Sequence, residues 1–270
     1  MTETAFPTTL GELCARLQSD LVFASWAWTL VAPLVAVALL FVTAPYSRHF
    51  TGRSLLRCTL PGALGWALME AVSPAVYLRA FVRAGGLAAP GAAPRVLALL
   101  WTAHYAYRAV VYPLRRRGGV LRAMPLEIAL LSAAFNTVNG ALNGAAAAQA
   151  HPSCAALALG AALWLAGFAG TVRSDETLRA LRRGPADAGV YRVPPPVGPH
   201  RWLVSPNYSC ECLEWLGYAV ATGGAPAAIS FAVWALANLA PRARANYKWC
   251  VAHFGSSMPR DRYVFIPFIW

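Results

Sequence analysis

The sequence predicts an all-α fold: a polytopic integral membrane protein with seven transmembrane helices and short cytosolic loops. Of the 270 residues, 58% are hydrophobic and only 13% are charged, which is typical of a membrane protein. Apolar stretches of roughly 17–25 residues recur along most of the chain, and each is long enough to cross the hydrocarbon core of a bilayer. A water-soluble core could not bury so many of them.

The expected spans are separated by connections rich in proline and glycine, such as RAGGLAAPGAAPR and RRRGGVLRAMP. The first apolar run lacks a basic leader and is too long for the core of a cleaved signal peptide, so we expect a retained anchor. The last two expected spans are short, so each must be tilted, buried within the protein or placed at the membrane interface. In order, the spans are residues 21–43, 60–82, 95–113, 124–148, 153–172, 207–222 and 224–240.

The formal net charge of +12 is explained by topology. Most of the 23 lysine and arginine residues fall in alternate connections, which the positive-inside rule places in the cytosol. The amino terminus is then outside or lumenal and the carboxyl terminus cytosolic, in the endoplasmic reticulum of a eukaryote or the inner membrane of a bacterium. We expect one membrane domain over residues 1–270, with a cytosolic loop at 173–206 and a tail at 241–270. We further expect a monomer that contacts membrane lipid and binds no nucleic acid.

The second and third spans carry polar groups that are costly at bilayer depth unless they are paired or hydrated, so each is a candidate functional group. Glu70 lies near the middle of the second span. Four hydrogen-bonding side chains, those of His104, Tyr105, Tyr107 and Arg108, follow within little more than one turn of the third. A tyrosine beside a buried carboxyl group could donate hydrogen bonds to a substrate carbonyl. Alternatively, Glu70 and Arg108 form a salt bridge that only locks two helices.

The fourth span combines small and amide side chains. Gly140 and Gly144 are four residues apart and predict a surface that another helix approaches closely. Glu127 begins this span, where the helix dipole favours a carboxylate, so we expect a structural role. Three asparagines share the glycine face and either join helices or line a polar cavity: Asn136, Asn139 and Asn143.

The sixth span opens with polar residues, so that Asn207, Glu211 and Glu214 could share one face of a short helix. The preceding loop, residues 173–206, is expected to hold a short amphipathic helix and a proline-rich stretch. Its arginines and those at 115–117 would meet an anionic cofactor arriving from the cytosol. The chain contains no glycine-rich nucleotide motif, and Cys210 and Cys212 lack further zinc ligands at suitable spacing, so no metal site is expected.

Several motifs occur together in the order and spacing of one known family. They are WALME, HYAYRAVVYPLR, FNTVNG, RSDETLRALR, YRVP, SPNYSCECLEWLGYAVAT, NLAPRARANYKW and the terminal IPFIW. From about residue 40 onward, the chain resembles the steroid 5α-reductase family (3-oxo-5α-steroid 4-dehydrogenases), and most of all its plant brassinosteroid-pathway branch. The resemblance implies a seven-helix membrane oxidoreductase that uses NADPH to reduce the Δ4 double bond of a 3-oxo steroid or sterol-like lipid.

The resemblance also implies roles by position. Glu70 and Tyr105 match the pair that hydrogen-bonds the steroid 3-keto oxygen, so that hydride from the nicotinamide adds at C5 and a proton reaches C4. Asn207 and Glu211 match residues that hold the nicotinamide end, whereas the pair Glu214 and Trp215 is expected to give structural support. The other expected cofactor contacts are Tyr112, Arg117, Asp175, Arg179, Arg182, Arg192 and Arg242.

The chain departs from the family pattern at positions that flank the expected cofactor or substrate. Asn246 and Tyr247 stand where histidine is usual, and Cys250 and Met258 stand where tyrosine is usual. An arginine that is common in animal members is replaced near Leu131. Two alternatives stay open: a related reductase acting on a polyprenol, an enoyl thioester or another sterol double bond, and a lipid-binding or transport protein whose polar core is structural.

Overall fold

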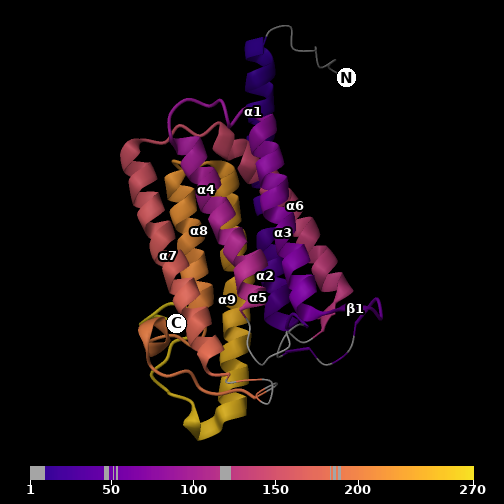
Figure 1. Cartoon of the computed structure of the whole chain (residues 1–270), viewed down its shortest axis with the longest axis vertical. Helices are drawn as coiled ribbons and strands as arrows, with labels where there is room; N and C mark the ends of the chain where they lie inside the picture. The colour runs from indigo at the N-terminus through magenta and orange to yellow at the C-terminus, as the bar shows by residue number, and fades with distance from the viewer. Residues whose placement is uncertain are drawn as a thin grey trace.

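The computed structural model describes residues 10–45, 49, 50, 52, 54–115, 123–182, 184, 187 and 190–270, and these form an elongated bundle that is mostly helical (Figure 1). The helices overlap all seven expected spans. In chain order the elements are α1 (Leu10–Thr29), α2 (Ala32–Phe41), β1 (Thr59–Leu60), α3 (Gly62–Arg83), α4 (Ala93–Ala106), the π-helix η2 (Tyr107–Val111), α5 (Tyr112–Leu114), β2 (Met124–Pro125), α6 (Leu126–Ala148), α7 (Cys154–Ala180), η4 (Gly198–Arg201), α8 (Pro206–Ala221), α9 (Pro226–Phe254) and η5 (Gly255–Ser257).

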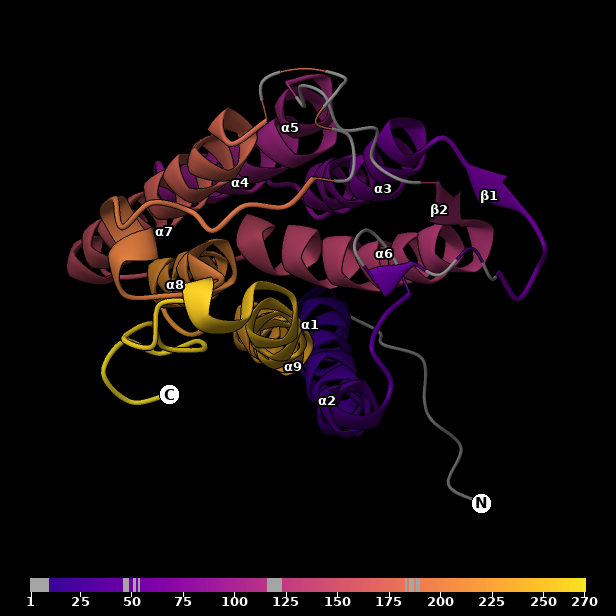
Figure 2. The same ribbon diagram turned by 90° about the horizontal axis from the view of Figure 1, so that it is seen from below.

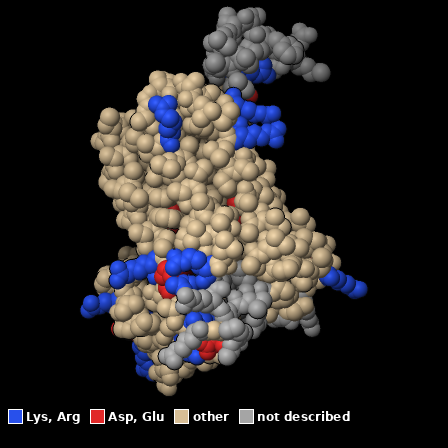
Figure 3. All heavy atoms as spheres, viewed as in Figure 1, with Lys and Arg blue, Asp and Glu red and all other residues tan. Residues whose placement is uncertain are grey.

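The outer surface has the character of a membrane protein. Two helical stretches in the described part of the chain, Gln18–Phe41 and Cys154–Ala180, are long and apolar enough to cross a membrane. Large apolar side chains point outward, including those of Phe23, Leu34 and Leu131, each more than two-thirds exposed. On the face in Figure 3, lysine and arginine gather towards the two ends, with a mostly uncharged band between them.

The first expected span is not one continuous helix. It divides into α1 and α2 at Leu30 and Val31, and Pro33 lies in the first turn of α2. Proline has no backbone N–H and its ring clashes with the preceding turn, which accounts for the break. The helix also begins at Leu10, before the expected start at residue 21.

Two other helices run past the ends of the expected spans. The short amphipathic helix expected in the 173–206 loop is the last part of α7, which runs without a break to Ala180 because no glycine or proline follows Gly170 until residue 184. Similarly, α9 continues to Phe254, so half of the expected tail at 241–270 is helical. Pro241 lies inside this helix, where its buried side chain is part of the packed face.

Glycines allow two pairs of helices to pack closely. A Cβ atom on Gly144 would lie 2.2 Å from the Tyr77 carbonyl oxygen, and one on Gly140 would lie 2.8 Å from the Ser73 carbonyl oxygen. The close approach predicted from the small residues of the fourth span is therefore confirmed, and its partner is α3. Gly160 and Gly167 play the same part between α7 and α8.

The asparagines of α6 connect helices. Asn136 donates a 2.7 Å hydrogen bond to the Met69 carbonyl of α3, and the Trp28 indole of α1 donates a 3.3 Å hydrogen bond to Asn139. Seen from below, α6 accordingly lies between α3 on one side and α1 and α9 on the other (Figure 2). Glu127 accepts hydrogen bonds from Ser54 and from the backbone N–H of Leu55, in agreement with a structural role.

The antiparallel pair β1–β2 fixes where α3 and α6 begin. Thr59 pairs with Pro125 and Leu60 with Met124, so the two helices start side by side at one end of the bundle. Farther along, the buried Trp101 is the centre of an aromatic core between α3, α4, α8 and α9. It stacks on Tyr77 at 4.8 Å and contacts Trp215 at 5.1 Å between ring centroids. This rigid core holds the inner faces of α4 and α8 against each other.

Candidate active site

A cavity of about 280 Å³ opens between α3, α4, α6, α8, α9 and the segment 190–205. This volume is near the lower end of the roughly 300–1,000 Å³ common for small-molecule sites. Nine of the eleven candidate residues line it, although they come from widely separated parts of the chain. These nine are Glu70, Tyr105, Tyr112, Asp175, Arg182, Arg192, Asn207, Glu211 and Arg242.

The two other candidate residues are not in this cavity. Arg179 lines a small adjoining pocket together with Asp175 and Arg182, and its guanidinium is paired with Glu176. Arg117 lies outside the described residues. The cavity itself is lined by residues of α3, α4, α6, α8 and α9, together with the end of α7 and the segment 190–205.

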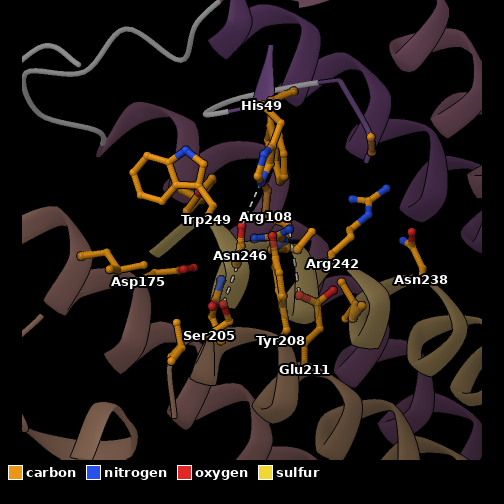
Figure 4. Close-up of a pocket in the computed structure, with 18 of the residues that line it drawn as sticks. His49, Arg108, Asp175, Ser205, Tyr208, Glu211, Asn238, Arg242, Asn246 and Trp249 are labelled. Atoms are coloured by element: carbon orange, nitrogen blue, oxygen red, sulfur yellow. Dashed lines mark hydrogen bonds and ion pairs between the residues drawn. The ribbon is translucent and has the colours of Figure 1, made fainter. Parts of the chain in front are cut away.

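Arg108 lies between the two carboxylates at the centre of the cavity. Its guanidinium nitrogen is 3.8 Å from Glu70 and 4.0 Å from Glu211, and all three side chains are nearly buried. The guanidinium also lies over two aromatic rings, 4.8 Å from the Trp66 centroid and 5.1 Å from that of Tyr112. Figure 4 shows Arg108 and Glu211 facing each other. One cation thus joins the helix of Glu70 to the helix of Glu211.

A local irregularity in the helix accompanies this placement of Arg108. Residues Tyr107–Val111 form a π-helix, in which each carbonyl would accept a hydrogen bond from the residue five positions later. For the Arg108 carbonyl that residue is Pro113, which has no N–H to donate. The Trp66 indole donates a 3.0 Å hydrogen bond to this carbonyl instead. The proline-induced widening is therefore stabilised by a side chain of α3.

A second buried pair supports the wall of the cavity. His104 Nδ1 and Glu214 Oε1 share a hydrogen bond of 2.7 Å, and Glu214 is fully buried. The His104 ring contacts the rings of Tyr105 and Trp215, with centroids 4.9 Å and 4.5 Å away. The pair ties α8 to α4 directly beside the phenol of Tyr105, which fixes the position of that phenol.

The mouth of the cavity is polar and aromatic. Asn246 is linked to His49 by a 3.3 Å contact and donates a 3.2 Å hydrogen bond to Ser205, two residues before Asn207 (Figure 4). Nearby, Tyr191 and Trp249 meet edge to face at 4.7 Å, and Arg182 lies 6.0 Å from the Tyr191 ring centroid. Flat aromatic and guanidinium surfaces of this kind suit a planar, anionic ligand.

His200 anchors the segment 190–205 to α7. Its side chain is fully buried, and Nε2 lies 3.4 Å from the carbonyl oxygen of Ser174, the neighbour of Asp175. Burial lowers the pKa of His200 to about 4 from its usual value near 6.5, and the positive charge of Arg262 acts in the same direction. The imidazole is therefore neutral in the folded protein at neutral pH.

The depressed pKa of His200 predicts a pH-dependent stability. An unfolded chain takes up this proton near pH 6.5, whereas the folded protein resists it until about pH 4. The free energy of unfolding should therefore fall as the pH is lowered through this window, by up to about 1.4 kcal/mol per pH unit. In equilibrium unfolding in detergent, His200→Gln should flatten this slope, and the exposed-site control His151→Gln should leave it unchanged. Equal slopes in wild type and His200→Gln would contradict the assignment.

Sequence reasoning missed the partners of these groups. Arg108 was considered only as a partner of Glu70, and Glu214 was assigned to support without its link to His104. Helical spacing places His104 and Arg108 on one face of the third span, four residues apart. That spacing gives no information about which face of α8 lies opposite, because the close packing of α7 and α8 sets the rotation of α8.

The arrangement combines a carbonyl-binding end with an anion-binding mouth. A carboxyl group and a phenol on the cavity wall can donate hydrogen bonds to a ketone when they are protonated. The Asn207 side chain has no hydrogen-bond partner among the described residues, so its amide is available to a ligand. Three arginines that line the cavity, Arg182, Arg192 and Arg242, can neutralise phosphate groups.

Comparison with known proteins places these residues in a family context. Residues 122–270 match the family described as 3-oxo-5-alpha-steroid 4-dehydrogenase. Steroid 5-alpha-reductase DET2 of Arabidopsis thaliana is 32% identical over 88% of this chain and 92% of its own length. The 3-oxo-5-alpha-steroid 4-dehydrogenase 1 of Bos taurus is 34% identical over 86% and 90%, and that of Homo sapiens is 30% identical over 83% and 86%.

Proposed function

The chain belongs to the 3-oxo-5-alpha-steroid 4-dehydrogenase family of oxidoreductases acting on CH–CH groups, and we propose that it reduces the Δ4 double bond of a 3-oxo steroid with NADPH. The resemblance identified from the motifs is thus confirmed. The observation that carries the proposal is that Glu70, Tyr105 and Glu211, from three different helices, line one cavity.

The residues present fit a nicotinamide dinucleotide. The amide of Asn207, which has no hydrogen-bond partner in the described part of the chain, and the carboxylate of Glu211 would hold the carboxamide end. Tyr112, Asp175, Arg182, Arg192 and Arg242 would hold the ribose and phosphate groups, together with Arg179 and Arg117 on the same cytosolic side. When bound, NADPH supplies the hydride for the steroid C5 position.

Glu70 and Tyr105 act on the other reactant. Both would donate hydrogen bonds to the 3-keto oxygen, which draws electron density from the conjugated double bond and makes C5 electrophilic. Their burial excludes water and strengthens these hydrogen bonds. Arg108 holds Glu70 and Glu211 in fixed relation, so it is a positioning residue for both ends of the reaction.

We place the protein in a membrane as a single domain over residues 1–270, with seven spans and a cytosolic carboxyl terminus. The uncharged band between two charged ends supports this placement. The basic connections bring the segment 173–206 and the polar mouth to the cytosol, where NADPH is available. The apolar steroid would come from membrane lipid, in the endoplasmic reticulum or a bacterial inner membrane, and the monomer contains the whole proposed site.

The proposal is tested with purified protein in detergent and a panel of unsaturated lipids. With NADPH, the protein should convert a 3-oxo-Δ4 steroid into the saturated ketone, which mass spectrometry detects as a gain of two hydrogen atoms. A polyprenol and an enoyl thioester should not be reduced. Turnover of either of these in place of the steroid, or of none of the three, would contradict the proposed substrate class. The Asn207→Ala variant should bind NADPH more weakly.

A further inference from the structure

Ser73 of α3 carries a hydroxyl group that the packing of the helices does not use. Its side chain is fully buried, and Oγ has no hydrogen-bond partner in the part of the chain that the structure describes. A buried hydroxyl of this kind costs free energy and calls for an explanation. Serine and threonine inside a helix often donate to the backbone carbonyl four residues earlier. Other hydroxyls in this bundle do so: Ser25, Thr29, Thr102, Thr137, Ser174 and Thr177.

The carbonyl that Ser73 would use in this way is already occupied. It belongs to Met69, and Asn136 of α6 donates a 2.7 Å hydrogen bond to it. In a regular helix the backbone N–H of Ser73 bonds to the same oxygen, and a carbonyl oxygen has two lone pairs. The Ser73 hydroxyl is therefore left to bond to a group outside its own helix.

Helix packing places Ser73 opposite Tyr105. α3 and α4 are joined by the connection 84–92 and run in opposite directions (Figure 1). Contacts on both sides of this level share one register: Tyr77 with Trp101 at 4.8 Å between ring centroids, Glu70 with Arg108 at 3.8 Å, and Trp66 with Tyr112 at 5.5 Å between ring centroids. One turn back from Tyr77 leads to Ser73, and one turn forward from Trp101 leads to Tyr105. The side chains of Ser73 and Tyr105 accordingly interact.

Ser73 lies behind the phenol of Tyr105 and not in the cavity. Tyr105 and Glu70 line the cavity, whereas Ser73 does not. α6 packs closely on this turn of α3, where a Cβ atom on Gly140 would lie 2.8 Å from the Ser73 carbonyl oxygen. The hydroxyl is thus held in a packed, water-free position next to the phenol, where it can act on the substrate only through Tyr105.

We propose that Ser73 is a positioning residue whose hydroxyl donates a hydrogen bond to the phenol oxygen of Tyr105 when substrate is bound. The inference rests on the proposed function and deepens its account of Tyr105. A phenol oxygen that accepts this hydrogen bond has its own proton free to point into the cavity, towards the substrate ketone. Hydrogen bonds in a chain strengthen one another in a low-dielectric site, so the phenol also becomes a stronger donor as negative charge develops on the ketone oxygen.

The Ser73→Ala variant removes only this hydroxyl. In the steroid assay with NADPH, its kcat should fall by about 3- to 10-fold with little change in KM, because the lost hydrogen bond acts on the transition state through Tyr105. Ser230→Ala is the matched control, since Ser230 of α9 also has a buried hydroxyl with no partner among the described residues and does not line the cavity. The control should keep the wild-type kcat, and both variants should unfold near the wild-type temperature.

Two further measurements show whether Ser73 acts through Tyr105. When Tyr105 is already phenylalanine, adding Ser73→Ala should cause no further loss of kcat, because there is no phenol left to orient. Infrared spectroscopy of the enone steroid bound together with NADP⁺ should give a higher C=O stretching frequency in Ser73→Ala than in wild type. A weaker hydrogen bond from the phenol polarises the carbonyl less, whereas a purely structural role of Ser73 would leave this frequency unchanged.

Failure of this inference differs from failure of the proposed function. Wild-type kcat in Ser73→Ala, or the same further loss of kcat in the Tyr105→Phe background as in wild type, would overturn the role of Ser73. Reduction of no 3-oxo-Δ4 steroid by wild type would overturn the proposed function itself. If Ser73→Ala does not fold, Ser73→Cys decides the inference, because its thiol has a similar size and is a much weaker donor, and the same loss of kcat is expected.

Discussion

Replacing Glu70 by glutamine or Tyr105 by phenylalanine is expected to lower kcat for enone reduction by about 10²- to 10⁴-fold. Both changes keep the approximate size of the side chain. Tyr105→Phe removes the hydroxyl that we propose donates to the substrate ketone, and Glu70→Gln replaces an acidic O–H donor with a far weaker amide N–H donor. These hydrogen bonds strengthen as negative charge develops on the oxygen, so their loss should reduce kcat more than it raises KM. Binding of NADPH, measured by fluorescence titration, should change little.

A matched control separates chemistry from folding. Tyr218→Phe also removes a buried phenol oxygen, which lies 2.9 Å from the Tyr77 hydroxyl and does not line the cavity. This variant should lose some thermal stability and keep its activity. Wild-type kcat in both Glu70→Gln and Tyr105→Phe would remove these residues from the mechanism.

Replacing Arg108 by leucine is expected to lower the free energy of unfolding by about 3–5 kcal/mol. The substitution leaves the Glu211 carboxylate buried without its cation and the Glu70 carboxyl group without its neighbour, and it also removes the contacts with Trp66 and Tyr112. Arg108→Lys keeps the charge and loses the planar stacking, so its loss should be smaller. Equilibrium unfolding in mixed micelles measures both.

A combined variant tests the electrostatic explanation. With Glu70→Gln and Glu211→Gln added, Arg108→Leu no longer leaves a buried carboxylate without a cation, and most of the lost stability should return. Activity should stay low in the combined variant. If Arg108→Leu alone is as stable as wild type, the guanidinium does not hold the two carboxylates together.

Much of the fold is predictable from the sequence because lipid-facing helices must be long and apolar. The helices overlap all seven apolar stretches, and the GxxxG-type face of α6 was correctly predicted to pack closely on another helix. The break at Leu30 and the continuation of α7 and α9 were not predicted. Pro33 lies at the start of a helix, whereas Pro241 lies inside one. The sequence does not distinguish these two cases, because the packing around each proline decides between them.

The sequence predicted which residues form the candidate site, but it did not predict which of them contact one another. Costly polar groups within apolar spans identified Glu70, Tyr105 and Glu211, which share a cavity. The contacts of Arg108 with Glu211 and of His104 with Glu214 depend on how α8 is rotated, which no periodicity within one helix reveals.

The departures from the family pattern differ in how close they are to the site. Asn246, Cys250 and Met258 line the cavity, and Asn246 takes part in the contact chain from His49 to Ser205. Leu131 is 68% exposed on the outer surface of α6. The first group is therefore placed to affect ligand binding, whereas Leu131 itself points away from the cavity.

The most direct measurement uses the steroid assay with NADPH that carries deuterium at the transferable position of the nicotinamide. If a nicotinamide donor and a conjugated ketone meet in this cavity, the saturated product should contain one deuterium, located at C5 by mass spectrometry and NMR. Product that forms without deuterium, or with deuterium at C4, would contradict hydride transfer to the carbon activated by Glu70 and Tyr105.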